Sequence, residues 1–497
     1  MLANFLLGAQ VALRPDALLM TLLGVAWGIL GGALPGISGS IAMALLLPFT
    51  FGMDPAVALM MLAGVYVGAM YGGSITAVLI STPGTPGSAI TVVDGYALHQ
   101  RGESGKALGV SLVTGTVGGI AGVCILVAFA IPLSRVALLF GPPEYFAFGV
   151  FGLALISSFV GRDLVKGGIS AVLGLMLATV GTDPFSGTPR FTFGSVDLVG
   201  GVAVAAGMIG LFAVSEIFYQ VAEGVDWERV RGRYATKLPS LRELWRLRVA
   251  TLIGIVFGTI EGLLPGGGGA IASFMAYNEA KRWSKHPEEF GRGSLEGVAA
   301  PETANNVVTA TALIPLLTFG IPGSNSAAIL LAGMMLHGLQ PGPALFERTP
   351  QVVYGLFVGL LVANLFMLGL GLLAVRPSIA LVNVRRPFLL AGILGLVLVG
   401  AYSIKNSMVE VWVVLATGAV GYLMRRYGYN VLAMVLGFVL GFMVEANLRR
   451  SLLISLGDPW VFFTRPISAV LLALAVLTFL WPLLRRARET RRAALAG

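Results

Sequence analysis

The sequence predicts an all-α integral membrane protein with about twelve transmembrane segments, some of them re-entrant or broken. Of its 497 residues, 56% are hydrophobic and 11% are charged, compared with roughly 25% charged residues in soluble domains. The apolar residues form long uncharged runs, such as 199–215 and 352–375, without the alternation typical of membrane barrel strands. The composition therefore excludes an ordinary soluble domain, and the pattern excludes a porin-like barrel.

Four Pro-Gly pairs interrupt these apolar segments. Pro35-Gly36 and Pro83-Gly84 lie in the first half, and Pro265-Gly266 and Pro322-Gly323 follow in the same order in the second. Proline lacks a backbone donor and interrupts a helix, and glycine tolerates the resulting turn. Paired breaks in two matching halves are typical of transporters built from internal repeats. We therefore expect two repeats and movement of a solute; the alternative is that the pairs only kink packed helices. An inverted topology of the two repeats is the hypothesis, and parallel halves are its alternative.

The basic residues predict the domain boundaries. The net charge is +9, and arginine and lysine concentrate in a central segment and in the tail, which places both on the cytoplasmic side of a membrane protein and does not indicate nucleic-acid binding. We expect a first repeat half over 1–225, a basic cytoplasmic linker over 226–248, a second repeat core over 249–384, and C-terminal helices over 385–497 that serve as a scaffold and end in a basic cytoplasmic tail.

The breaks also predict a binding site. A helix that restarts after a break presents unpaired N–H groups and the positive end of its dipole, which attract carboxylates. Unwound carbonyl groups and nearby hydroxyl and amide oxygens suit a hard cation such as sodium. The expected substrate- or ion-binding residues are Pro35, Gly36, Ser38, Gly39, Ser40, Thr82, Pro83, Gly84, Ser88, Gly266, Gly267, Glu302, Asn305, Asn306, Pro322, Gly323, Ser324, Asn325 and Ser326. We place a sodium ion near Ser38, Asn305 and Asn325, with a proton as the other coupling ion, and expect no cofactor.

Three acidic residues in apolar surroundings are further candidates, because such residues are costly and are often functional. Glu302 is assigned either to ion or substrate binding or to capping a helix. Glu261 directly precedes the third break and is either a proton or cation site or a residue facing an opening. Asp94, in an Asp-Gly-Tyr sequence, is assigned to a structural turn.

Several motifs together resemble one family. They are residues 31–36, 64–74, 81–84 and 94–96 in the first half, and Pro301-Glu302-Thr303-Ala304-Asn305-Asn306 and residues 320–323 in the second. In this order they are similar to the TctA family, the large permease subunit of the tripartite tricarboxylate transporters. The resemblance implies a multi-pass protein of the bacterial inner membrane that works with a small TctB-like membrane subunit and a periplasmic TctC-like solute-binding protein. It also implies ion-driven uptake of tricarboxylates, dicarboxylates or aromatic carboxylates, and an elevator-type architecture.

Two other functions remain as alternatives. Broken helices can also line the pore of a passive anion channel. The sequence around Ser38 fits a G-x-S-G pattern, so that Ser38 with His337 would give a rhomboid-like intramembrane serine protease. The chain has neither an H-E-x-x-H helix nor a G-x-x-x-x-G-K-[ST] loop, so no other enzyme is indicated, and we predict that the protein is not an enzyme.

Overall fold

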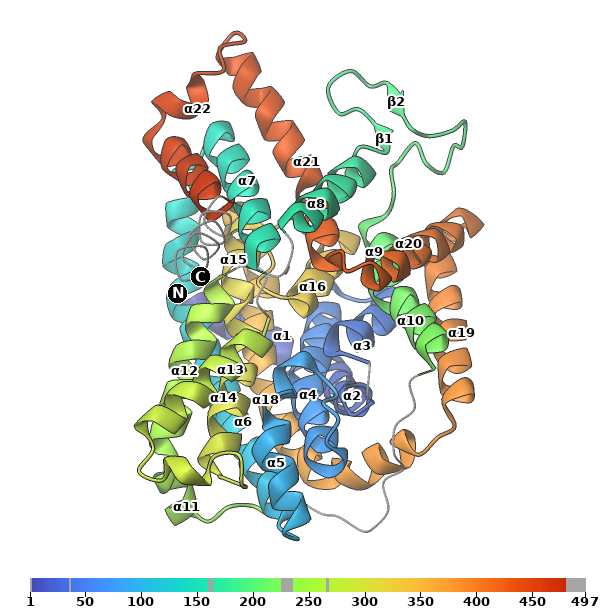
Figure 1. Ribbon diagram of the computed structural model, residues 1–497. Helices are drawn as coiled ribbons and strands as arrows, with labels where there is room; N and C mark the ends of the chain where they lie inside the picture. Colours follow the sequence, from blue (N-terminus) through green and yellow to red (C-terminus); the bar gives the residue numbers. More distant parts are fainter. Residues whose placement is uncertain (1, 35–36, 160–163, 225–235, 265–267, 480–497) are drawn as a thin grey trace, which may run out of the picture.

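The computed structural model describes residues 2–34, 37–159, 164–224, 236–264 and 268–479, and this part of the chain is predominantly helical (Figure 1). Its one described sheet is the antiparallel pair β1 (Gly181–Thr182) and β2 (Pro189–Arg190). The predicted all-α membrane class is therefore confirmed.

Eight helices within the described ranges are long and apolar enough to cross a membrane, so the expected count of about twelve is not confirmed. These helices are Pro15–Gly32, Pro55–Ile80, Ser104–Ala137, Val204–Glu223, Pro350–Val382, Pro387–Lys405, Met408–Arg426 and Val431–Ile454. Two of the shorter apolar helices in the described residues, Gly39–Thr50 and Asn325–Leu336, begin just after a break. The breaks thus divide apolar sequence into pieces too short to span a bilayer of about 30 Å.

The N-terminal group of helices contains the first two breaks. It consists of α1 (Leu2–Ala12), α2 (Pro15–Gly32), α3 (Gly39–Leu46), η1 (Leu47–Thr50), α4 (Pro55–Ile80), η2 (Pro86–Ser88), α5 (Thr91–Gln100) and α6 (Ser104–Ala137). A second group contains the other two breaks. It consists of α11 (Leu241–Arg246), α12 (Arg248–Leu263), α13 (Ala270–Trp283), η4 (Pro287–Glu289), α14 (Glu296–Thr311), α15 (Leu313–Phe319), α16 (Asn325–Leu336), α17 (Pro343–Arg348) and α18 (Pro350–Val382).

Helix α4 is the buried axis of the first group. It begins where Asp54 accepts hydrogen bonds from the N–H groups of the first turn, and it packs closely against α2. The two backbones meet through glycine: a Cβ at Gly28 would lie 2.3 Å from the carbonyl oxygen of Val65, and one at Gly68 would lie 2.3 Å from that of Val25. Small residues at helical spacing let membrane helices approach in this way. Any larger residue at these glycines would push α2 away from α4.

The two groups of helices interlock. Helix α2 packs against α4, and α12 packs against α14. The long helix that closes each group crosses to the other one, because α6 packs against α14 and α18 packs against α4. Helices α3 and α16, which follow the first and fourth breaks, lie near the middle of the molecule (Figure 1).

The remaining helices form an outer group around this core. They are α7 (Pro142–Phe159), α8 (Leu164–Ala178), α9 (Val204–Ile209), the π-helix η3 (Gly210–Val214), α10 (Ser215–Glu223), α19 (Arg386–Lys405), α20 (Met408–Arg426), α21 (Val431–Ile454) and α22 (Val461–Thr464). Helices α7 and α8 pack on α21, and α9 and α10 pack on α20. The outer group therefore joins the end of the first half to the C-terminal helices.

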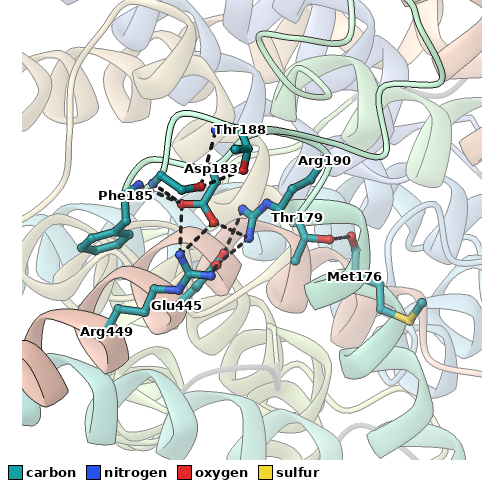
Figure 2. A network of polar contacts seen from close by, with 9 residues as sticks. Met176, Thr179, Asp183, Phe185, Thr188, Arg190, Glu445 and Arg449 are labelled. Carbon is teal, nitrogen blue, oxygen red and sulfur yellow. Dashed lines mark hydrogen bonds and ion pairs between the residues drawn. The ribbon is translucent and has the colours of Figure 1, made fainter. Parts of the chain in front are cut away.

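An ion-pair network fixes the β1–β2 hairpin to α21 (Figure 2). The carboxylate of Asp183 accepts hydrogen bonds from the N–H groups of Phe185 and Ser186 at 2.8 and 3.0 Å, and it pairs with Arg449 at 2.8 Å. Arg190 bridges Asp183 at 3.3 Å and Glu445 at 2.6 Å. The backbone donors and Arg449 hold the pKa of Asp183 well below its usual range because both favour the ionised carboxylate.

Candidate binding cavity

A cavity of about 660 Å³ lies where the four breaks meet. Each break contributes one short segment to its lining, namely 38–40, 85–87, 268–270 and 324–326. Helix α4 adds Tyr66 and Met70, and α14 adds Asn305 and Val308. The volume lies within the range of about 300–1,000 Å³ typical of small-molecule sites.

Two of the segments are helix starts that follow extended or left-handed backbone. Ser38 is the extended residue before α3, and its hydroxyl lies 2.8 Å from that of Ser40. Gly268 and Gly269 precede α13 with φ values of 51° and 28°, a region that glycine enters without the strain a side chain would bring. The first and third breaks therefore end in helix N-termini at the cavity.

The other two segments follow the ends of α4 and α15. Helix α15 ends at Gly320, whose φ is 76°, and the chain re-enters a helix at Asn325. There the hydroxyl of Ser324 accepts a hydrogen bond from the N–H of Ala327 at 3.1 Å. In the second break, α4 ends at Ser81, and the single turn η2 precedes α5. Segments of all four breaks thus line one region.

The breaks face each other across the two halves. A Cβ at Gly39 would lie 3.6 Å from the hydroxyl oxygen of Ser326, so the first break faces the fourth. A Cβ at Gly269 would lie 3.7 Å from the Cα of Gly87, so the third break faces the second. The cavity is therefore built from both halves at once.

One polar side chain from α4 and one from α14 reach this junction. The hydroxyl of Tyr66 lies 2.8 Å from that of Ser324. Asn305 is only 1% exposed, and within the described residues neither its Oδ1 nor its Nδ2 has a hydrogen-bond partner. A buried amide without partners costs free energy, so Asn305 is a polar group that a bound ligand or ion can satisfy.

The opposite wall of the cavity comes from the outer group. It comprises Lys166 of α8, Phe212 of η3, Arg425 of α20 and residues 428–432, which lead into α21. Sequence reasoning missed both cations, because nothing in the local sequence of α8 or α20 shows that these helices reach the breaks.

Comparison with known proteins identifies the family. The model of the Tripartite tricarboxylate transporter TctA family matches residues 18–436. This chain belongs to the TctA family. It is 38% identical over 491 residues to an uncharacterized 52.8 kDa protein in the TAR-I ttuC' 3'region of Agrobacterium vitis, an alignment covering 99% of this chain and 98% of that one. A second Agrobacterium vitis protein, in the TAR-II ttuC' 3'region, is 38% identical over 234 residues, covering 47% of this chain and 97% of that protein. The resemblance stated from the motifs is thereby confirmed.

Family membership makes this TctA chain the membrane component of a tripartite tricarboxylate transporter, in a family of transporters and not of enzymes. The family implies association with TctB and TctC components. Together with the eight candidate spans it gives a multi-pass membrane protein.

The cavity of this TctA chain contains seven of the residues expected from the sequence. These are Ser38, Gly39, Ser40, Asn305, Ser324, Asn325 and Ser326. The three residues assigned to a sodium ion, Ser38, Asn305 and Asn325, are all among them. Four other expected residues, Pro35, Gly36, Gly266 and Gly267, lie outside the described residues.

A second set of expected residues shapes the breaks without lining the cavity. The N–H of Gly84 donates to the carbonyl of Gly73 at 3.2 Å, and that of Gly323 donates to the carbonyl of Ala312 at 3.4 Å. A Cβ at Gly84 would lie 1.9 Å from the carbonyl oxygen of Gly32. The remaining members of this set are Thr82 and Ser88, whose hydroxyls donate to the carbonyls of Ile80 and Thr85, together with Pro83 and Pro322.

Glu302 also lies away from the cavity. It is fully buried, and its carboxylate accepts hydrogen bonds from Ser74 and Thr91, both at 2.5 Å, and from Ser111 at 3.1 Å. These donors come from α4, α5 and α6, so the carboxylate ties three helices to α14. The Nδ2 of the neighbouring Asn306 donates to the carbonyl of Glu302 at 2.9 Å, and this side chain lies against Gly115 of α6.

Asp94 has a structural role, as expected, but it lies in the first turn of helix α5 and not in the separate turn predicted from the sequence. Its Oδ1 accepts hydrogen bonds from the N–H groups of Gly291, Gly293 and Ser294 at 2.8–2.9 Å, and its Oδ2 accepts one from Tyr277 at 2.8 Å. The carboxylate therefore fastens α5 to the loop before α14.

The serine–histidine pair of the protease alternative is not assembled. Ser38 is near Ser326, at the beginning of α16, whereas His337 follows the last residue of the same helix. At about 1.5 Å per residue, this helix separates the two by roughly 16 Å. The described hydrogen-bond partner of the Ser38 hydroxyl is Ser40.

Proposed function

We propose that this chain carries out ion-gradient-driven secondary uptake of an organic carboxylate across the bacterial inner membrane. The substrate is a tricarboxylate, a dicarboxylate or an aromatic acid, delivered by a periplasmic TctC-like binding protein, and the chain works with a small TctB-like subunit. The observation that supports this most directly is the single cavity shared by segments of all four breaks. Helix N-termini that converge on one cavity favour an anion there.

We further propose that the two halves are inverted repeats. Two relationships in the described residues support this. The N–H of Gly84 donates to the carbonyl of Gly73, and the N–H of Gly323 donates to the carbonyl of Ala312. The two residues of each pair are separated by the same number of positions along the chain. The crossed packing of α6 on α14 and of α18 on α4 is likewise reciprocal. A pseudo-two-fold axis through the cavity accounts for both, and it gives two equivalent routes to one site.

The outer group of helices then supplies the scaffold of an elevator-type transporter. We assign to it the C-terminal helices of 385–497, as expected from the sequence, and add α7 to α10 from the 1–225 half, because these pack on α20 and α21. The moving part comprises the breaks of the 1–225 half and of the 249–384 core, and 226–248 links the two. Sliding of one body against the other exposes the cavity to each side in turn.

The coupling ion is proposed to be sodium, bound near Ser38, Asn305 and Asn325. The unpartnered amide of Asn305 supports this choice, because neutral oxygens suit a hard monovalent cation and add no charge that would repel the substrate from the helix N-termini. A cation bound beside a carboxylate stabilises it electrostatically, which couples the two binding events.

The test is uptake into membrane vesicles that contain this chain, its TctB-like subunit and a TctC-like binding protein. Radiolabelled benzoate, succinate and citrate are supplied under an inward sodium gradient, an inward proton gradient, or neither. We expect accumulation that requires the sodium gradient and is lost in Asn305→Ala. Uptake that follows only the proton gradient would replace sodium by a proton, and equilibration without any gradient would establish a passive anion channel.

A further inference from the structure

We propose that Arg425 and Lys166 are specificity-determining residues that hold a second carboxylate of the substrate, and so favour di- and tricarboxylates over monocarboxylates. This inference deepens the proposed function and rests on it. It starts from the unequal charge of the two cavity walls. The segments contributed by the breaks carry no formal charge, whereas the opposite wall carries Arg425 and Lys166. None of the lining residues is acidic, so the described cavity favours anions.

Arg425 is positioned for this role by a fixed partner. Its Nη1 pairs with Glu216 of α10, which also accepts a hydrogen bond from Gln220 at 2.9 Å. Its Nε is buried, and within the described residues it has no hydrogen-bond partner. A guanidinium presents five donors in a planar fork that matches a carboxylate. Glu216 therefore orients the group by one edge and leaves Nε for a ligand.

Lys166 and the turn after α20 extend this wall. The ammonium of Lys166 donates to the carbonyl of Tyr427 at 2.7 Å and lies 5.3 Å from the ring centre of Tyr429. Asn430 caps α21 by accepting hydrogen bonds from Leu432 and Ala433 through its Oδ1. Its Nδ2 is a buried donor without a partner in the described part of the chain. Lys166 therefore adds a second cation to the wall that Arg425 lines, and the turn adds the amide donor of Asn430.

The two walls together set a requirement on the substrate. The breaks offer backbone N–H groups at helix starts, and the outer wall offers a guanidinium and an ammonium. A molecule with carboxylates at both ends satisfies both walls, whereas a monocarboxylate leaves one wall unsatisfied.

The experiment measures binding, which needs neither a gradient nor the partner subunits. The purified full-length chain in nanodiscs is titrated calorimetrically with benzoate, succinate and citrate. We expect Arg425→Gln to weaken succinate and citrate binding by about 10- to 100-fold, the range for one charge-assisted hydrogen-bonded contact. Benzoate affinity should change by less than about threefold, so the citrate-to-benzoate affinity ratio should fall. Lys166→Gln should act in the same direction.

Matched variants separate specificity from damage to the fold. Arg426→Gln is the control, because this neighbouring arginine is outside the cavity and its Nη1 donates to Tyr422. It should leave all three affinities unchanged. Since Arg425→Gln leaves Glu216 unpaired, the double variant Glu216→Gln/Arg425→Gln is measured as well and should reproduce the lowered ratio.

A citrate-to-benzoate ratio that is unchanged in Arg425→Gln and Lys166→Gln would overturn the inference. Equal weakening of all three probes would do so too, as would a wild-type chain that binds none of them. Failure of the proposed function would give a different result. The citrate-to-benzoate affinity ratio in nanodiscs would still fall in Arg425→Gln, but wild-type vesicles would show no gradient-driven uptake.

Discussion

The side-chain oxygen Oδ1 of Asn305 occupies the space in which a side chain on Gly87 would begin. A Cβ at Gly87 would lie 1.8 Å from this oxygen, and a Cβ at Gly269 would lie 2.4 Å from it. Asn305 therefore reaches between the second and third breaks, one from each half of the chain. The amide is held there by shape and not by hydrogen bonds, because neither of its polar atoms has a partner among the described residues.

Gly87→Ala should consequently abolish function without abolishing folding. The new methyl group displaces the end of the Asn305 side chain, which can rotate, so the folded yield in size-exclusion chromatography should stay near wild type. Loss of the amide from its place should lower sodium-driven uptake at least about tenfold, since small misplacements at a site are costly. Wild-type uptake by this variant would remove the Asn305–Gly87 junction from the site.

Two other glycines provide the comparison for this variant. Gly369 of α18 has open space around its Cβ position, so Gly369→Ala should match wild type in both assays. A Cβ at Gly84 would meet the carbonyl oxygen of Gly32 at 1.9 Å, and backbone cannot rotate out of the way. Gly84→Ala should therefore lower the folded yield itself.

Removal of the Asn305 amide should leave the ligand-free protein at least as stable as wild type. Asn305→Ala deletes two buried polar atoms that make no described hydrogen bond, and burying such atoms costs about 1–3 kcal/mol. The expected melting temperature without sodium is unchanged or higher, and the rise caused by added sodium should be absent. Differential scanning fluorimetry with sodium or choline chloride measures both.

The control for this variant is Asn364→Ala. The Oδ1 of Asn364 is also buried without a described partner, but the residue does not line the cavity. Its sodium response should equal that of wild type. A sodium-dependent stabilisation that survives in Asn305→Ala would move the ion to another site.

Glu302 should matter for folding more than for binding. Glu302→Ala leaves the hydroxyls of Ser74, Thr91 and Ser111 without their shared acceptor, and each buried donor left unsatisfied costs about 1–3 kcal/mol. We expect little folded protein. Glu302→Gln keeps one acceptor oxygen, so it should fold with a lower melting temperature and retain carboxylate binding in nanodiscs. Loss of binding by folded Glu302→Gln would return this residue to the site.

The sequence was informative about the breaks because proline and glycine act locally on the backbone. The segments at 38–40 and 324–326 line the cavity within a few residues of where they were expected. The second break differs: Pro83 and Gly84 were expected at the site, but Thr85, Pro86 and Gly87 line the cavity. Gly84 packs closely against the backbone of Gly32. No local motif reveals this contact.

Long-range packing decided what the sequence could not show. Arg425 and Lys166 come from distant helices, and the packing of the outer group on the break helices, such as α9 on α16 and η3 on α3, brings them to the breaks. Glu302 and Asn305 are three residues apart in α14, a spacing that predicts neighbouring side chains and a shared site. The structure separates them, because hydroxyls of α4, α5 and α6 surround the Glu302 carboxylate while Asn305 lines the cavity. The expected count of about twelve segments is not confirmed, because several apolar pieces of the described chain, two of them directly after a break, are shorter than a membrane span.

The hairpin network predicts acid sensitivity at one residue. The pKa of Asp183 is lowered by the N–H groups of Phe185 and Ser186 and by Arg449, so its contribution to stability is fully present above the unfolded-state pKa of about 3.9 and is lost as the pH falls towards the lower folded-state value. Asp183→Asn should therefore melt below wild type at pH 6–7, and the difference should shrink as the pH drops through about 4. Fluorimetry in acid-stable detergent measures it, with Asp197→Asn, at an exposed position in the segment after β2, as the control. A difference that stays constant from pH 7 to pH 3 would show that the carboxylate acts through its shape and not through its charge.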